Sequence, residues 1–137
     1  MYKKIMVPVD LSHIDRLQKA LDTGADLARH YGVPICYVGV TSAAPGPLGH
    51  NPQEYSRKLS EFAQAEADRR SIAAEARAYV SHDPAVDLDK TLLGAAHDVE
   101  ADLVVMASHV PGLPDHIFAS NAGYLASHAD ISVFVVR

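Results

Sequence analysis

Short apolar runs alternate with longer amphipathic segments along the chain, and this alternation constrains the fold more than any other feature. The apolar runs are typical of buried β-strands, whereas the longer segments repeat apolar residues at helical spacing. The predicted strands are residues 5–9, 35–40, 74–80, 103–107 and 131–136, and the predicted helices between them are residues 15–30, 54–70, 87–97 and 119–128. Strands that alternate with helices in this way predict an α/β fold, in which a parallel sheet carries helices on both faces.

One domain is expected over residues 1–137, because the composition does not change along the chain. Right-handed crossovers leave few arrangements for parallel strands, and we favour an open five-stranded sheet with the order 3-2-1-4-5. This order puts the topological switch point between the first and fourth strands, beyond whose carboxyl ends open α/β sheets bind ligands. The alternating pattern of residues 74–80 predicts an edge strand, and the prolines and glycines of residues 41–52 predict a surface loop.

Charge and composition exclude several classes of protein. The formal net charge is −5, with acidic and basic residues interspersed, which argues against a nucleic-acid partner. Neither a membrane span nor a signal peptide is expected, because no apolar run reaches about 18 residues and Pro8 and Asp10 interrupt the N-terminal run. The single cysteine, Cys36, forms no internal disulfide, which favours the reducing cytoplasm. We interpret Cys36 as a small buried residue of a strand.

Polar residues follow the predicted strands at the switch point. Asp10 ends the first strand, residues 107–109 end the fourth, and Ser120 and Asn121 open the last helix. The N-terminus of a helix binds anions through its backbone N–H groups and its dipole, so this end of the sheet is a candidate phosphate site. Asp10 and Ser120 are equally explained as helix caps, and His109 as a loop residue that packs on the end of the sheet.

No catalytic residue or metal site is predicted. The chain has no Walker A motif and no Gly-x-Ser-x-Gly elbow, and the adjacent Ser108 and His109 point different ways, which disfavours a nucleophile–base pair. The pocket segments contain neither lysine nor arginine, so any hydrolysis is expected to be slow or absent. His109, Asp115 and His116 lie in one loop, but we do not predict a metal site there. The other histidines are scattered, without helical i, i+4 pairs: His13, His30, His50, His82, His97 and His128.

The chain resembles the universal stress protein family over essentially its whole length. The segments that carry the resemblance are KKIMVPVDLS at residues 3–12, DLVVMASH at residues 102–109 and SNAGYLASHADISVFVVR at residues 120–137. The Ala-Ser-His-x-Pro sequence at residues 107–111, with Ser-Asn at 120–121, is most similar to the F-type small bacterial members. The resemblance implies a Rossmann-like fold of the adenine nucleotide alpha-hydrolase type and a cytoplasmic stress-response protein.

The nucleotide-binding branch of this family carries a glycine motif that this chain changes. The family pattern is glycine, two residues, glycine, nine residues, then glycine followed by serine or threonine. Here the glycine positions correspond to Ala107, Val110 and Ala119, with a loop one residue shorter, and the hydroxyl corresponds to Ser120. Alanine adds only a methyl group, whereas Val110 is β-branched and poorly suited to positive φ. The helix N-terminus at Ser120 then remains for a phosphate.

The resemblance implies that Asp10 and Val40 face the nucleoside, beside an apolar wall formed by Val9, Val40 and Val104. The implied ligand is ATP or another adenine nucleotide, with or without Mg²⁺. The predicted binding residues are Pro8, Val9, Asp10, Val40, Ala107, Ser108, His109, Val110, Ala119, Ser120 and Asn121.

We therefore predict an ATP-binding sensor or regulator of a stress response rather than an enzyme with rapid turnover. Two alternatives stay open. One is a nucleotide-free member that acts through protein–protein interaction, with its pocket closed by Val110 and the neighbouring prolines. The other is a slow hydrolase of phosphorylated small molecules.

A homodimer is expected through residues Ile131–Val136, which are almost all apolar. A terminal edge strand of this kind exposes a template for pairing, and two-fold pairing with an identical edge covers it. The resemblance implies the same antiparallel pairing of last strands. The alternative is an edge shielded by the chain's own loops. No nucleic-acid or membrane partner is expected.

Overall fold

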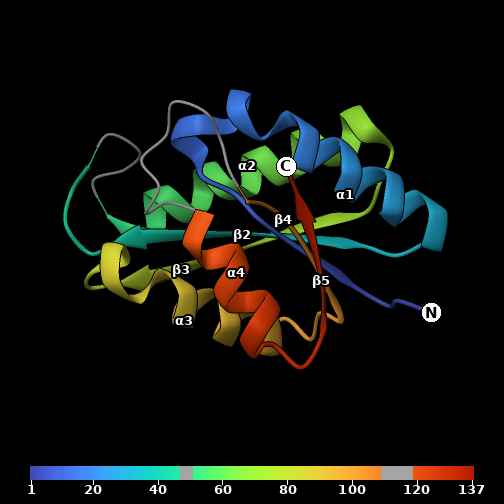
Figure 1. Cartoon of the computed structure of the whole chain (residues 1–137). Coiled ribbons are helices and arrows are strands. Elements are labelled where there is room, and N and C mark those ends of the chain that lie inside the picture. Colours follow the sequence, from blue (N-terminus) through green and yellow to red (C-terminus); the bar gives the residue numbers. More distant parts are fainter. Residues whose placement is uncertain (47–50, 109–118) are drawn as a thin grey trace.

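Parallel strands in the order β3-β2-β1-β4-β5 form the centre of the protein (Figure 1). The computed structural model describes residues 1–46, 51–108 and 119–137, with the backbone alone at 85, 119 and 120. The strands are β1 (Ile5–Pro8), β2 (Ile35–Ser42), β3 (Ala74–Ser81), β4 (Leu103–Ala107) and β5 (Ser132–Val136). The predicted α/β class and strand order are confirmed.

Helices cover both faces of the sheet, with α1 and α2 on one face and α3 and α4 on the other (Figure 1). Right-handed crossovers require this division, because the chain moves outward from β1 to β3 and then returns across the sheet to β4 and β5. The helices are α1 (Gln18–Tyr31), α2 (Pro52–Arg70), α3 (Pro84–Asp98) and α4 (Ala119–His128), and a kinked 3-10 segment, η1 (Leu11–Leu17), precedes α1.

The ends of the helices follow from local chemistry. Helix α1 ends at Gly32, whose φ of 66° is the left-handed conformation that glycine adopts without strain. Helix α2 begins where the Asn51 side chain accepts a hydrogen bond from the backbone N–H of Glu54 at 2.8 Å. Helix α3 begins at Pro84, earlier than predicted, because proline fits the first turn of a helix. Strand β2 runs on to Ser42, two residues into the predicted loop.

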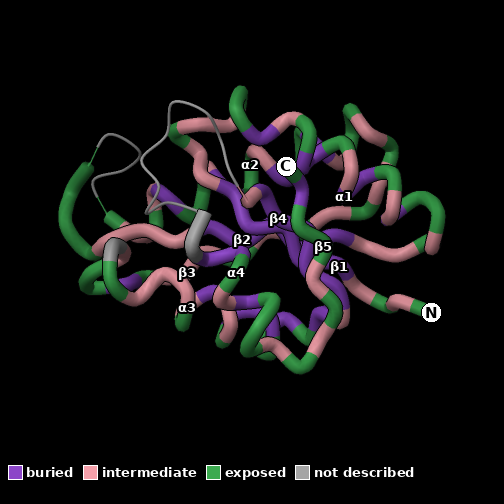
Figure 2. Tube along the Cα trace, in the orientation of Figure 1, coloured by how far each residue is buried: buried purple, intermediate pink, exposed green. Residues whose placement is uncertain are grey.

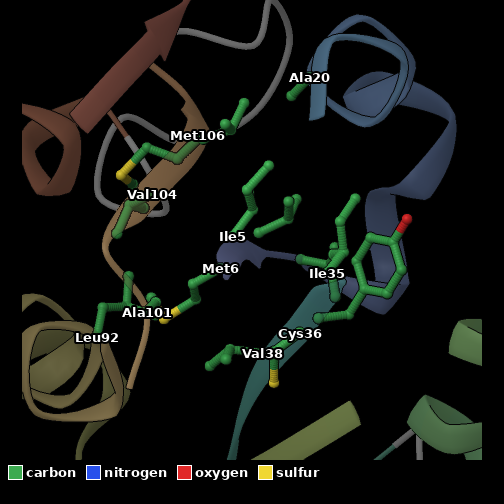
Figure 3. Packing of buried hydrophobic residues seen from close by; sticks show 14 of the residues in the cluster. Ile5, Met6, Ala20, Ile35, Cys36, Val38, Leu92, Ala101, Val104 and Met106 are labelled. Carbon is green, nitrogen blue, oxygen red and sulfur yellow. The ribbon is translucent and has the colours of Figure 1, made fainter. Parts of the chain in front are cut away.

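The core lies on both faces of the central strands, and every residue of β1 and β4 is buried (Figure 2). Figure 3 shows Ile5 on the α1 side of the sheet and Met6 on the opposite side, toward Leu92 of α3. Strand β3 is half-exposed, as its alternating sequence predicted for an edge. Cys36 is fully buried on β2, and burial together with the charge of Glu75 raises its pKa to about 11.

A polar cluster joins α1 to α2. The buried carboxylate of Glu66 accepts hydrogen bonds from Arg69 and Arg70 through one oxygen, and Arg70 also donates to Asp22 and Gln18 of α1.

No helix within the described ranges is long and apolar enough to cross a bilayer.

Candidate functional site

The two strands at the switch point are joined only at their amino ends. Within the described residues, β1 pairs with β4 at just two positions, Ile5 with Leu103 and Met6 with Val104. Pairing of β1 with β2, and of β4 with β5, continues to the strand ends. The ladder between β1 and β4 therefore stops where the predicted site begins.

Pro8 explains why this ladder stops. The backbone N–H groups of Ile5 and Val9 donate to carbonyls that precede or lie in β2, at N–O distances of 3.1 and 2.9 Å. N–H groups alternate sides along a strand, so the N–H of Met6 and the backbone nitrogen of Pro8 face β4. Proline has no N–H to donate, and the hydrogen bonding of β1 to β4 ends after Met6.

The amino ends of the same strands are held together by Asp102. Its carboxylate accepts hydrogen bonds from the backbone N–H groups of Lys3 and Lys4, at distances of 3.0–3.1 Å. Its own backbone N–H donates to the carbonyl of Lys4 at 3.1 Å.

We call the carboxyl ends of β1 and β4, with the residues around them, the switch-point site.

Asp10 lies two residues after the end of β1, which stops one residue earlier than predicted, and it caps η1. One carboxylate oxygen accepts from the backbone N–H of Ser12 at 3.0 Å, and the other lies 2.9 Å from Nδ1 of His13. The cap interpretation of Asp10 is therefore confirmed, whereas its contact with a nucleoside stays a prediction.

His13 owes this contact to its backbone. Its φ of −137° and ψ of 35° are not helical, and they kink η1. The backbone N–H of His13 also donates to the Asp10 carbonyl at 3.0 Å. Sequence analysis counted His13 among the scattered histidines and missed this role. The signal was the i, i+3 spacing of an acid and a histidine immediately after a buried strand.

Tyr55 of α2 is a second residue that sequence analysis missed as part of this region. It is buried beside Gly39 of β2, which precedes the half-buried Val40. Burial raises the pKa of the Tyr55 hydroxyl, and the negative charge of Asp10 raises it further. That electrostatic interaction joins the start of α2 to Asp10, the residue that caps η1.

The predicted apolar wall is wrong in one member. Val104 is fully buried at the start of β4, opposite Met6, and so belongs to the core (Figure 3). Depth along a strand decides this, because only residues near the carboxyl end of β4 reach the switch point. Val9 is buried directly after β1, and Val40 is half-buried near the end of β2.

At the exit of β4 the backbone is already used within the sheet. The N–H of Ser108 donates to the carbonyl of Val136 in β5 at 2.9 Å, so it is occupied rather than available to a phosphate. The Ser108 hydroxyl is shielded from solvent and has no hydrogen-bond partner among the residues that the structure describes. Ala107, at the first motif glycine position, is buried.

The parallel topology brings the N-terminus of α4 to the same edge as the ends of β1 and β4. Asn121, in the first turn, is buried. Ala119 and Ser120 lie in that turn with side chains outside the described residues, and His109 and Val110 lie outside them altogether. The phosphate half of the predicted site therefore stays a prediction.

No group of three or more His, Cys, Asp or Glu side chains that could hold a metal ion occurs in the described ranges. The polar groups that the structure does bring to the switch point include the carboxylate of Asp10, the imidazole of His13 and the hydroxyls of Tyr55 and Ser108. Such groups bind neutral hydroxyls and amines through directed hydrogen bonds.

An open parallel sheet with this order, and with polar residues at its switch point, defines a Rossmann-like α/β protein. The family model described as the universal stress protein family matches residues 1–137, and the chain belongs to that family. This confirms the family that the sequence motifs predicted.

Individual relatives align with this chain over nearly the full length of both chains. Universal stress protein G of Salmonella typhimurium is 29% identical over 148 residues, covering 100% of both chains. A universal stress family protein from Burkholderia pseudomallei has a TM-score of 0.71 at 27% identity, over 98% of this chain and 96% of that one. The universal stress protein from Archaeoglobus fulgidus in complex with dAMP has a TM-score of 0.70 at 21% identity, over 99% and 98%.

Proposed function

We propose that this protein binds an adenine nucleotide, ATP in the first instance, at the switch-point site and acts as a sensor or regulator. The observation that carries the proposal is the end of the β1–β4 ladder at Met6, with Asp10 and His13 beside it. Ligands of open α/β sheets bind at this point. The Archaeoglobus relative, whose structure contains dAMP, supports the nucleoside class.

We assign the role to binding rather than turnover. The described residues of the switch-point site include neither lysine nor arginine to stabilise a transferring phosphoryl group. The N-terminus of α4 offers backbone N–H groups and a favourable dipole to the phosphates, and Mg²⁺ would accompany ATP through those phosphates. A cytoplasmic location fits the single, buried Cys36, which needs no oxidising compartment.

Titration calorimetry tests the proposal with ATP, AMP and adenosine, each with and without Mg²⁺, and with GTP as the matched control. Saturable binding of the adenine ligands, weaker for GTP, is the expected result. Purified protein is also denatured and its supernatant assayed for adenine nucleotide. Absence of binding by every adenine ligand, with none carried through purification, contradicts the proposal and favours the nucleotide-free alternative. ATP hydrolysis above the rate without protein would favour the slow hydrolase.

We also propose that the protein forms a homodimer through β5. This strand is an edge of the sheet, and it leaves Phe134 and Val135 exposed at 45% and 37%. The opposite edge, β3, instead carries Glu75 and Arg77, charges that discourage edge pairing.

Light scattering after size exclusion should give twice the mass of one chain. The substitution Val135→Lys on β5 should give the monomer mass, whereas Val80→Lys, at an exposed position on β3, should leave the dimer intact. A wild-type monomer at high concentration contradicts the proposal.

A further inference from the structure

The carboxylate of Asp10 is engaged on both oxygens before any ligand arrives. One oxygen accepts from the Ser12 N–H at 3.0 Å, and the other contacts Nδ1 of His13 at 2.9 Å. An ionised carboxylate can only accept, so Nδ1 of His13 is the donor in this pair. Asp10 thus orients the imidazole and fixes which of its nitrogens carries the proton.

The second imidazole nitrogen has a different character. With the proton on Nδ1, the neutral ring presents a lone pair at Nε2, which accepts a hydrogen bond. The His13 side chain is 35% exposed, against 21% for Asp10. Among the described residues, Nε2 of His13 has no hydrogen-bond or ion-pair partner. The pair therefore offers a ligand an acceptor on His13, held in place by Asp10.

We propose that His13, rather than Asp10, makes the direct contact with the nucleoside, and that Nε2 accepts a hydrogen bond from a ribose hydroxyl. Asp10 is then the positioning residue. This inference rests on the proposed function and refines it. A ribose hydroxyl fits better than a phosphate, because the carboxylate–imidazole pair is negative when the ring is neutral and repels an anion.

Tyr55 of α2 interacts electrostatically with Asp10, so the start of α2 also borders the pair.

Two substitutions separate the contact from the fold. In His13→Asn, the amide nitrogen stands near the place of Nδ1 and keeps a donor for Asp10, but nothing replaces Nε2. In Asp10→Asn, the amide oxygen still accepts from the Ser12 N–H, while its NH₂ group donates to Nδ1 and moves the ring proton to Nε2. Both variants should keep the wild-type melting temperature within a few degrees, which would show that the cap remains.

The experiment measures the affinities of adenosine, AMP and dideoxyadenosine, which lacks the hydroxyls of the ribose ring, by calorimetry. His13→Asn should weaken adenosine and AMP alike, by about three- to tenfold, and leave dideoxyadenosine unchanged. Heteronuclear NMR should find the proton on Nδ1 in the wild type and on Nε2 in Asp10→Asn, with a similar loss of affinity.

Unchanged adenosine affinity in His13→Asn overturns the inference while leaving the proposed function intact. A loss confined to AMP would point to a phosphate contact, and an equal loss for dideoxyadenosine to a merely structural role; both overturn it. A wild-type protein that binds no adenine ligand removes the proposed function and this inference together.

Discussion

The hydroxyl of Tyr55 lies against the backbone of Gly39, where an added β-carbon would stand 2.2 Å from it. Glycine is therefore required at position 39 for lack of space, and no unusual backbone conformation is involved. The contact fixes the start of α2 over the end of β2, close to Asp10.

Substitution Gly39→Ala should destabilise the protein by about 1–3 kcal/mol, because the new methyl group overpacks a buried site. Urea unfolding measures the loss. Gly94→Ala is the matched control: nothing lies within 4 Å of its β-carbon position on α3, and alanine favours a helix, so no loss is expected. Adding Tyr55→Phe should recover part of the loss; equal stability of Gly39→Ala and wild type would refute the contact.

Pro8→Ala restores an N–H on the side of β1 that faces β4. We expect this amide to exchange slowly with solvent, because it can extend the ladder beyond Met6. Hydrogen exchange followed by NMR gives the rate at this one position. Adenine nucleotide affinity should fall in the same variant, since the strands are drawn together at the switch point. An amide at position 8 that exchanges as fast as those of the exposed loops contradicts our explanation of the ladder.

Glu66→Ala removes a buried carboxylate that accepts from both Arg69 and Arg70. The loss of unfolding free energy should be about 3 kcal/mol, because Arg70 stays largely buried without its main partner in α2. Glu61→Ala, on the same helix, breaks an exposed pair with Arg57 and should change stability by less than about 0.5 kcal/mol. Similar effects of the two substitutions would contradict the importance of burial here.

Cys36 should make stability depend on pH in the alkaline range. Its pKa is raised from 9.0 to about 11 in the folded protein, first by burial and then by the charge of Glu75. The unfolded chain therefore loses the thiol proton first, so this stabilisation is complete below pH 9 and disappears as the pH rises toward 11. The loss should be about 2–3 kcal/mol.

Urea unfolding of wild type and Cys36→Ala at several pH values isolates this thiol from the tyrosines, which titrate in both proteins. Above pH 9, the free energy of unfolding of the wild type should fall relative to that of Cys36→Ala. A difference that stays constant to pH 11 contradicts a raised pKa. A thiol reagent at neutral pH should also modify Cys36 only after unfolding.

The fold could be predicted from the sequence because its signals are local. Apolar runs and helical spacing located each strand and each of the four main helices, and the crossover rule left few arrangements, among which the favoured order 3-2-1-4-5 is the observed one. Boundaries were less accurate where they depend on one residue's conformation. The kink at His13, which lies within η1, leaves no periodic trace in the sequence.

The site could be predicted only in part. The position of Asp10 was confirmed, since strand ends follow directly from the pattern. The contact of Tyr55 with Gly39 joins segments that the sequence cannot pair, and the role of Pro8 depends on which neighbour each N–H faces. Val104 was misplaced because an apolar residue looks the same at either end of a strand.

Asp102, directly before β4, accepts hydrogen bonds from the backbone of Lys3 and Lys4, directly before β1, whereas Pro8 leaves the carboxyl ends of the two strands without mutual hydrogen bonds. Among the described residues, backbone hydrogen bonds therefore set the spacing of β1 and β4 at one end only, and beyond Met6 the packing of buried side chains holds the two strands together.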